Sequence, residues 1–191
     1  MRETEITVQV LEKNWKNKLE EQGFSIVEKF QLNDYYYSRF SIEELKSFTY
    51  ENILRNSFIV RNVIDDNNIT KIMFKDKALD NCGNVVSEEK IQTKVEDLNK
   101  TLKIFDMAGI NKWCCLRQES SVYKKGKIVF VVQEVEGLGV FIEYEEDENI
   151  TGTTEQEKMT QMFETLKSLN LKLGNDISCK KVYLKFLKEN K

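Results

Sequence analysis

The chain has 191 residues, of which 40% are hydrophobic and 32% charged, and its formal net charge is -3. This balance is typical of one soluble globular domain with a sizeable core and excludes a disordered chain. The negative charge gives no overall attraction to nucleic acid, and no apolar run reaches the roughly 20 residues that span a bilayer. We therefore expect a single cytoplasmic domain over 1–191, with no nucleic-acid or membrane partner.

The first part of the chain predicts strands around one short helix. The opening ten residues alternate between polar and apolar side chains, as a half-buried strand does. An amphipathic helix follows and ends near Gly23. Further strands are predicted at residues 24–31, 34–38, 57–64 and 69–75. The letters "DDNN" at 65–68 predict a hairpin turn, so we expect a mainly antiparallel sheet.

The second part of the chain predicts helices at both ends of a second group of strands. Apolar residues at helical spacing predict a helix over about 96–108, which Gly109 ends. Strands are then expected at about 112–121, 127–134 and 139–145. Two helices close the chain, the first over roughly 155–170 and the second around Val182 and Phe186.

Two pairs of glutamates share a strand face in the same way. Glu3 and Glu5 project from one side of the first strand, and Glu143 and Glu145 do so in "FIEYE". Like charges at this spacing repel each other unless water, cations or a bound metal screens them. A solvated face explains either pair alone, whereas the repetition near opposite ends of the chain favours a site.

Three basic residues alternate with apolar neighbours on other strands: Arg61 in "FIVRNV", Lys75 in "ITKIMFK" and Arg117 in "CCLRQE". Taken singly, each is at least as consistent with a surface salt bridge. If amphipathic helices cover the apolar faces, however, the charged faces point inward. A sheet that closes on itself would then form a tunnel lined with acids and bases.

The chain contains no histidine, which removes the usual general base near neutral pH. The four cysteines, Cys82, Cys114, Cys115 and Cys179, lack metal-ligand spacing, so a zinc site is not expected. These absences favour metal-assisted phosphate chemistry or plain ligand binding.

Four segments in the same order resemble the CYTH proteins, also called triphosphate tunnel metalloenzymes, which include class IV adenylyl cyclases and thiamine triphosphatases. The segments are "ETEIT", "NDYYYS", "ITKIMFK" and "EVEGLGVFIEYE", and the C-terminal "CKKVYLKFL" resembles the helix that follows them. The resemblance implies an α+β fold: a closed or nearly closed antiparallel eight-stranded β-barrel, or tunnel, with flanking helices.

The resemblance also implies roles for individual residues. Mg²⁺ or Mn²⁺ would be held by the four glutamates, Glu3, Glu5, Glu143 and Glu145. Phosphate would be bound by the basic residues Arg61, Lys75 and Arg117, with Lys90 as a further cation. The implied partner is a triphosphate or nucleotide bound by a monomer or homodimer, and no catalytic residue is assigned.

Several positions depart from the family pattern. Thr7, Ile59 and Cys115 stand where the family has cations, Lys90 and Gln92 where it has acids, and Gln133 where it has an aspartate. Two functions therefore remain open. One is metal-dependent turnover of a triphosphate, as an adenylyl cyclase or a triphosphate phosphohydrolase. The other is a catalytically degenerate module that binds a phosphorylated or other anionic ligand without turnover.

Overall fold

The computed structural model describes residues 4–65, 67–79 and 85–190. The strands are β1 Glu5–Val10, β2 Ser25–Ser38, β3 Ser57–Ile64, β4 Ile69–Leu79, β5 Val85–Val95, β6 Asn111–Lys125, β7 Ile128–Val135 and β8 Gly139–Glu145. The helices are α1 Trp15–Glu21, α2 Ile42–Lys46, α3 Tyr50–Arg55, α4 Leu98–Met107, α5 Glu155–Lys167 and α6 Lys181–Glu189.

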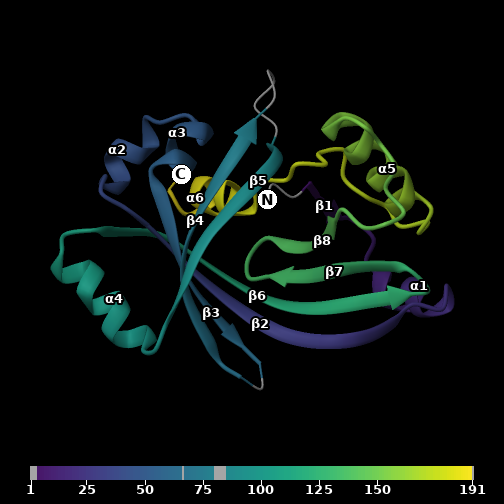
Figure 1. Ribbon diagram of the computed structural model, residues 1–191, viewed down its shortest axis with the longest axis horizontal. Helices are drawn as coiled ribbons and strands as arrows, with labels where there is room; N and C mark the ends of the chain where they lie inside the picture. The colour runs from purple at the N-terminus through teal and green to yellow at the C-terminus, as the bar shows by residue number, and fades with distance from the viewer. Residues whose placement is uncertain (1–3, 66, 80–84, 191) are drawn as a thin grey trace.

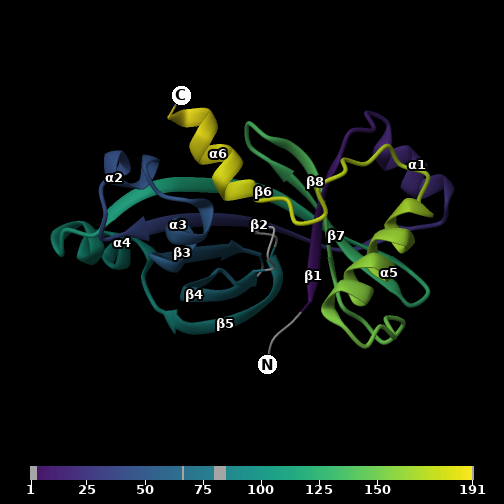
Figure 2. The ribbon, with the colours of Figure 1, turned by 90° about the horizontal axis from the view of Figure 1, so that it is seen from above.

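The strands form one antiparallel sheet in the order β1-β8-β7-β6-β2-β3-β4-β5. The sheet curls into a half-barrel with helices around it (Figures 1 and 2). The predicted α+β class, with eight antiparallel strands and flanking helices, is confirmed. None of the helices in the described part of the chain has the length and apolar content that a membrane-spanning helix needs.

The structure corrects the predicted elements in two regions. The strands expected at 24–31 and 34–38 are one continuous strand, β2, because residues 31–34 pair with β6 without a break. Strand β5 and the short helices α2 and α3 were not predicted. Charged residues alternate with apolar ones only weakly along β5, and the two helices are too short for a clear helical period.

One hydrophobic core lies on the outer face of strands β1, β6, β7 and β8. Ile6 and Val8 on β1 and Ile142 on β8 are almost fully buried there, against α1 and α5. Because side chains alternate along a strand, burying these residues turns their neighbours toward the inside of the curl. The outer core therefore fixes which residues face inward.

A second core closes one end of the curl. Phe186 of α6 is buried and meets the ring of Trp113 edge-on, with 5.3 Å between the ring centres. The segment before α6 pairs with β1, since Thr7 exchanges backbone hydrogen bonds with Ile177 and Cys179. Strand β1 thus holds the start of α6 against the inside of the sheet.

Replacing Phe186 by alanine should lower the free energy of unfolding by about 3–5 kcal/mol, because it leaves a cavity in the second core. Leu187 on the same helix is 42% exposed. Its alanine variant should change stability by less than about 0.5 kcal/mol. Urea denaturation of both variants measures the difference, and equal effects would contradict the packing of α6 into the sheet.

Candidate functional site

A cavity of about 420 Å³ lies inside the curled sheet. Carboxylates and basic groups both line it. The charged lining residues are Glu5, Glu28, Asp34, Arg61, Lys71, Lys75, Lys77, Lys90, Glu143, Glu145, Lys180 and Lys181. They come from strands on both sides of the curl and from the start of α6, so residues far apart in the sequence meet here.

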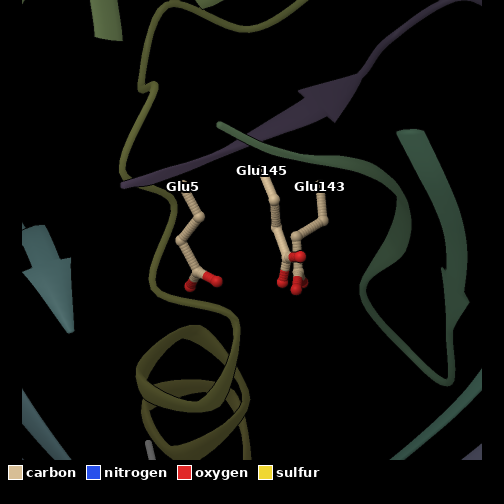
Figure 3. A group of neighbouring side chains, drawn as sticks. All are labelled: Glu5, Glu143 and Glu145. Atoms are coloured by element: carbon tan, nitrogen blue, oxygen red, sulfur yellow. The ribbon is translucent and has the colours of Figure 1, made fainter. Parts of the chain in front are cut away.

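Three of the predicted metal ligands come together. Glu5 on β1 lies opposite Glu145 on β8, and Glu143 is two residues earlier on the same strand. One carboxylate oxygen from each of the three lies within 4.8 Å of the others. Figure 3 shows the three side chains pointing to the same space. The fourth predicted ligand, Glu3, lies outside the described residues.

The electrostatics of this acidic trio, Glu5, Glu143 and Glu145, suit a bound cation. Burial raises the pKa of Glu5, and Glu143 raises it further, while Lys75 opposes the shift. The buried Oε2 atom of Glu5 has no hydrogen-bond partner among the described residues. Hard carboxylate oxygens are the ligands that Mg²⁺ and Mn²⁺ prefer, so the trio fits such an ion.

Lys181 at the start of α6 is a site residue that the sequence reasoning missed. Its Nζ atom donates to Glu143 Oε2 at 2.9 Å and also to Gln133 Oε1. Burial alone would raise the pKa of Glu143, but Lys181 and Lys75 outweigh it and hold that pKa well below its usual value. The signal was weak, because a lysine in "CKKVYLKFL" resembles any helix-surface lysine.

A second charged cluster lies on the hairpin of β4 and β5. Glu88 is fully buried and accepts hydrogen bonds from Lys75, at 2.8 Å, and from Lys77. Burial alone would raise the pKa of Glu88, but the two lysines lower it to about 2. Lys90 lies 3.6 Å from the same carboxylate and 3.4 Å from Glu145 across the curl. The predicted cations Lys75 and Lys90 therefore both line the cavity.

Arg61 also lines the cavity, as predicted, and holds a buried carboxylate. Its Nε and Nη2 atoms donate to the two oxygens of Asp34 at 2.7 and 2.6 Å. Burial opposes the charge on Arg61, but Asp34 outweighs it and raises the pKa of the guanidinium. A bidentate ion pair of this kind fixes the orientation of the arginine.

The expectation that Arg117 faces the tunnel is wrong. Its side chain is 62% exposed and lies 3.6 Å from Glu136 on the outer surface. Leu116 and Gln118, on either side of it, line the cavity instead, because successive side chains on a strand point to opposite faces. Arg117 and its neighbour Cys115 are therefore left out of the candidate site.

Four other departures do line the cavity: Thr7, Ile59, Gln92 and Gln133. They are uncharged, so this part of the wall offers apolar surface and neutral hydrogen-bonding groups where the resemblance implied charges. Lys90 is the fifth departure that lines the cavity, and it adds a cation there. The cavity thus combines the acidic trio with basic groups, several of which already contact carboxylates.

Comparison with known sequences finds a relative that matches over nearly the whole chain. No family model matches the chain. A Methanocaldococcus jannaschii protein named "Putative adenylate cyclase" is 28% identical over 186 residues, covering 96% of this chain and 97% of that protein.

Two solved structures share the fold. The PH1819 protein of Pyrococcus horikoshii gives a TM-score of 0.70 at 19% identity, with 99% of each chain covered. A Hippeastrum protein gives a TM-score of 0.59 at 13% identity, with 98% of this chain and 96% of that chain covered. That protein is named "Putative adenylyl cyclase HpAC1" and is said to reveal a dominant triphosphatase activity. At these identities the structural likeness establishes the fold alone.

Replacing Glu88 by glutamine should lower the free energy of unfolding by about 3–5 kcal/mol near pH 6, because two partly buried lysines lose their fully buried counter-charge. The difference in unfolding free energy between variant and wild type should shrink as the pH falls from 4.5 toward about 2. Glu88 of the wild type then becomes protonated and is as uncharged as the glutamine. Urea denaturation across this range measures it.

Glu164 forms an exposed ion pair with Lys167 and provides the control. Its glutamine variant should cost less than about 1 kcal/mol at every pH. If the loss of unfolding free energy in Glu88→Gln became larger on acidification, it would contradict the lowered pKa of that carboxylate.

Proposed function

We propose that the chain binds a triphosphate-containing ligand with Mg²⁺ or Mn²⁺ in the cavity and turns it over. The reaction would be that of a class IV adenylyl cyclase, from ATP to cyclic AMP and diphosphate, or that of a triphosphate phosphohydrolase. One observation carries the proposal: the trio of Glu5, Glu143 and Glu145 faces basic groups inside one cavity. The names of the Methanocaldococcus and Hippeastrum proteins support the same ligand class.

The cation would be held by the acidic trio, where it would neutralise charge on the phosphate groups. Lys75, Lys181 and Arg61 point basic groups into the same cavity and would bind phosphate oxygens. Each charge-assisted hydrogen bond of this kind contributes roughly 1.5–3 kcal/mol. Phosphoryl transfer depends mainly on positioning and charge stabilisation, so the absence of histidine from the sequence is compatible with turnover.

Binding without turnover is the second candidate, and the internal ion pairs favour it. Arg61 is engaged by Asp34, and both Lys75 and Lys77 by Glu88. A ligand phosphate must compete with these carboxylates for the same donors. Ile59 and Gln133 line the same cavity but are uncharged, so they provide no further positive charge for the phosphate.

Mg²⁺ or Mn²⁺ at about 100 times its dissociation constant should stabilise the fold by about 2.7 kcal/mol. For a chain of this size, that corresponds to a rise of about 5–10 °C in the melting temperature. The Glu143→Gln variant should lose most of this response, since it removes one negative charge from the trio. Glu148 forms an exposed pair with Lys127, and its glutamine variant should respond like the wild type. An unchanged melting temperature at millimolar metal would contradict the metal site.

Purified protein should be incubated with ATP, thiamine triphosphate or tripolyphosphate and either metal, with products separated by chromatography. Cyclic AMP and diphosphate would identify a cyclase, and release of terminal phosphate a phosphohydrolase. Calorimetric binding without products would favour the second candidate, and no binding would contradict both.

Lys181→Gln should weaken tripolyphosphate binding about ten-fold or more, because a charged donor to phosphate is lost. Lys188 on the same helix donates to the backbone oxygen of Gly137 and provides the matched control. Its glutamine variant should bind tripolyphosphate like the wild type. An equal loss in both variants would indicate a general charge effect instead of a phosphate contact.

A further inference from the structure

The Lys90 ammonium lies between two carboxylates from opposite sides of the curled sheet. Its Nζ atom is 3.4 Å from Glu145 on β8 and 3.6 Å from Glu88 on its own strand, β5. Strands β5 and β8 are not neighbours in the sheet, so Lys90 joins them across the cavity. A cation shared by Glu88 and Glu145 would have to occupy this same space.

From these contacts we propose that the protein holds one divalent cation in the acidic trio and that Lys90 excludes a second. Lys90 competes with the metal for Glu145 and takes the place that a second metal would need. This inference rests on the metal site of the proposed function and extends it to the number of ions and to the residue that sets it.

The charges around the trio support a single ion. Glu143 already contacts Lys181 at 2.9 Å, and Glu145 contacts Lys90. Only the third member, Glu5, has a buried oxygen without a hydrogen-bond partner in the described part of the chain. Lys75 also acts on Glu5 and Glu143, so three ammonium groups offset the three carboxylates, and a second divalent cation would meet a net positive site.

The other buried carboxylates of the cavity offer no second site. Both oxygens of Glu88 accept hydrogen bonds from Lys75 and Lys77, and both oxygens of Asp34 accept from Arg61. A divalent ion beside Glu88 would meet like charges from Lys75, Lys77 and Lys90. Within the described residues, the trio is the one group of three or more potential ligand side chains that lie close enough together to share an ion.

Manganese binding to the purified protein without any phosphate ligand tests the inference, with free Mn²⁺ followed by electron paramagnetic resonance. The wild type should bind one Mn²⁺ per chain. Lys90→Gln should keep this number and tighten binding by about five-fold or more, since the competing ammonium is gone. Lys90→Glu should bind a second Mn²⁺, because it adds a carboxylate between Glu88 and Glu145.

Lys127 pairs with Glu148 at 2.8 Å on the surface, so Lys127→Gln is the matched control for the loss of one positive charge. It should leave both the number and the affinity of bound Mn²⁺ unchanged. Wild-type protein that binds two ions, or none, would overturn the inference, as would unchanged affinity in Lys90→Gln. The wild-type count decides the number of ions even if a variant fails to fold.

Tripolyphosphate binding, measured separately by calorimetry, tests the proposed function. If tripolyphosphate binds while the manganese count differs from one, the inference fails and the proposed ligand stands. If one Mn²⁺ binds and tripolyphosphate does not, the proposed ligand fails and the single metal site stands.

Discussion

Charge that is buried inside the curled sheet must be neutralised close by, and the arrangement of the cavity follows from this constraint. Transferring an unpaired ion out of water costs several kcal/mol, whereas a hydrogen-bonded partner offsets much of that cost. Glu88 is therefore held by two lysines, Asp34 by Arg61, and Glu143 by Lys181. Glu5 is the exception, with one buried oxygen left unpaired, and this makes the trio the natural place for a cation.

The scaffold holds these charges in place from outside the cavity. Strands β1 and β8 bury Ile6 and Ile142 under α1 and α5, so the glutamates next to them face inward. The segment before α6 pairs with β1 and carries Lys181 to Glu143. Ligand-binding groups on paired strands are positioned more rigidly than groups on loops, which suits a site that acts through positioning and charge.

The two candidate functions differ in what a phosphate must displace. In a turnover enzyme, the basic groups have to leave their carboxylate partners for the ligand, and a metal on the trio would help by taking over Glu143 and Glu145. In a binding module, the same pairs would persist beside the ligand. The fold that this chain shares with the Hippeastrum protein is compatible with both, because the inward side chains, and not the sheet, determine the chemistry.

The sequence by itself determined the alternation of the strands, the antiparallel sheet and the shared face of Glu143 and Glu145 on β8. These are local properties, since the period of two along a strand sets the face of each side chain. Only the tertiary structure decided the rest. The sheet turned the face that carries Leu116 and Gln118 toward the cavity and so left Arg117 outside, and the contact between distant segments brought Lys181 to Glu143. The curvature of the sheet brought Lys90 on β5 within 3.4 Å of Glu145 on β8. Such contacts depend on strand register and on the closure of the sheet, which no short stretch of sequence encodes.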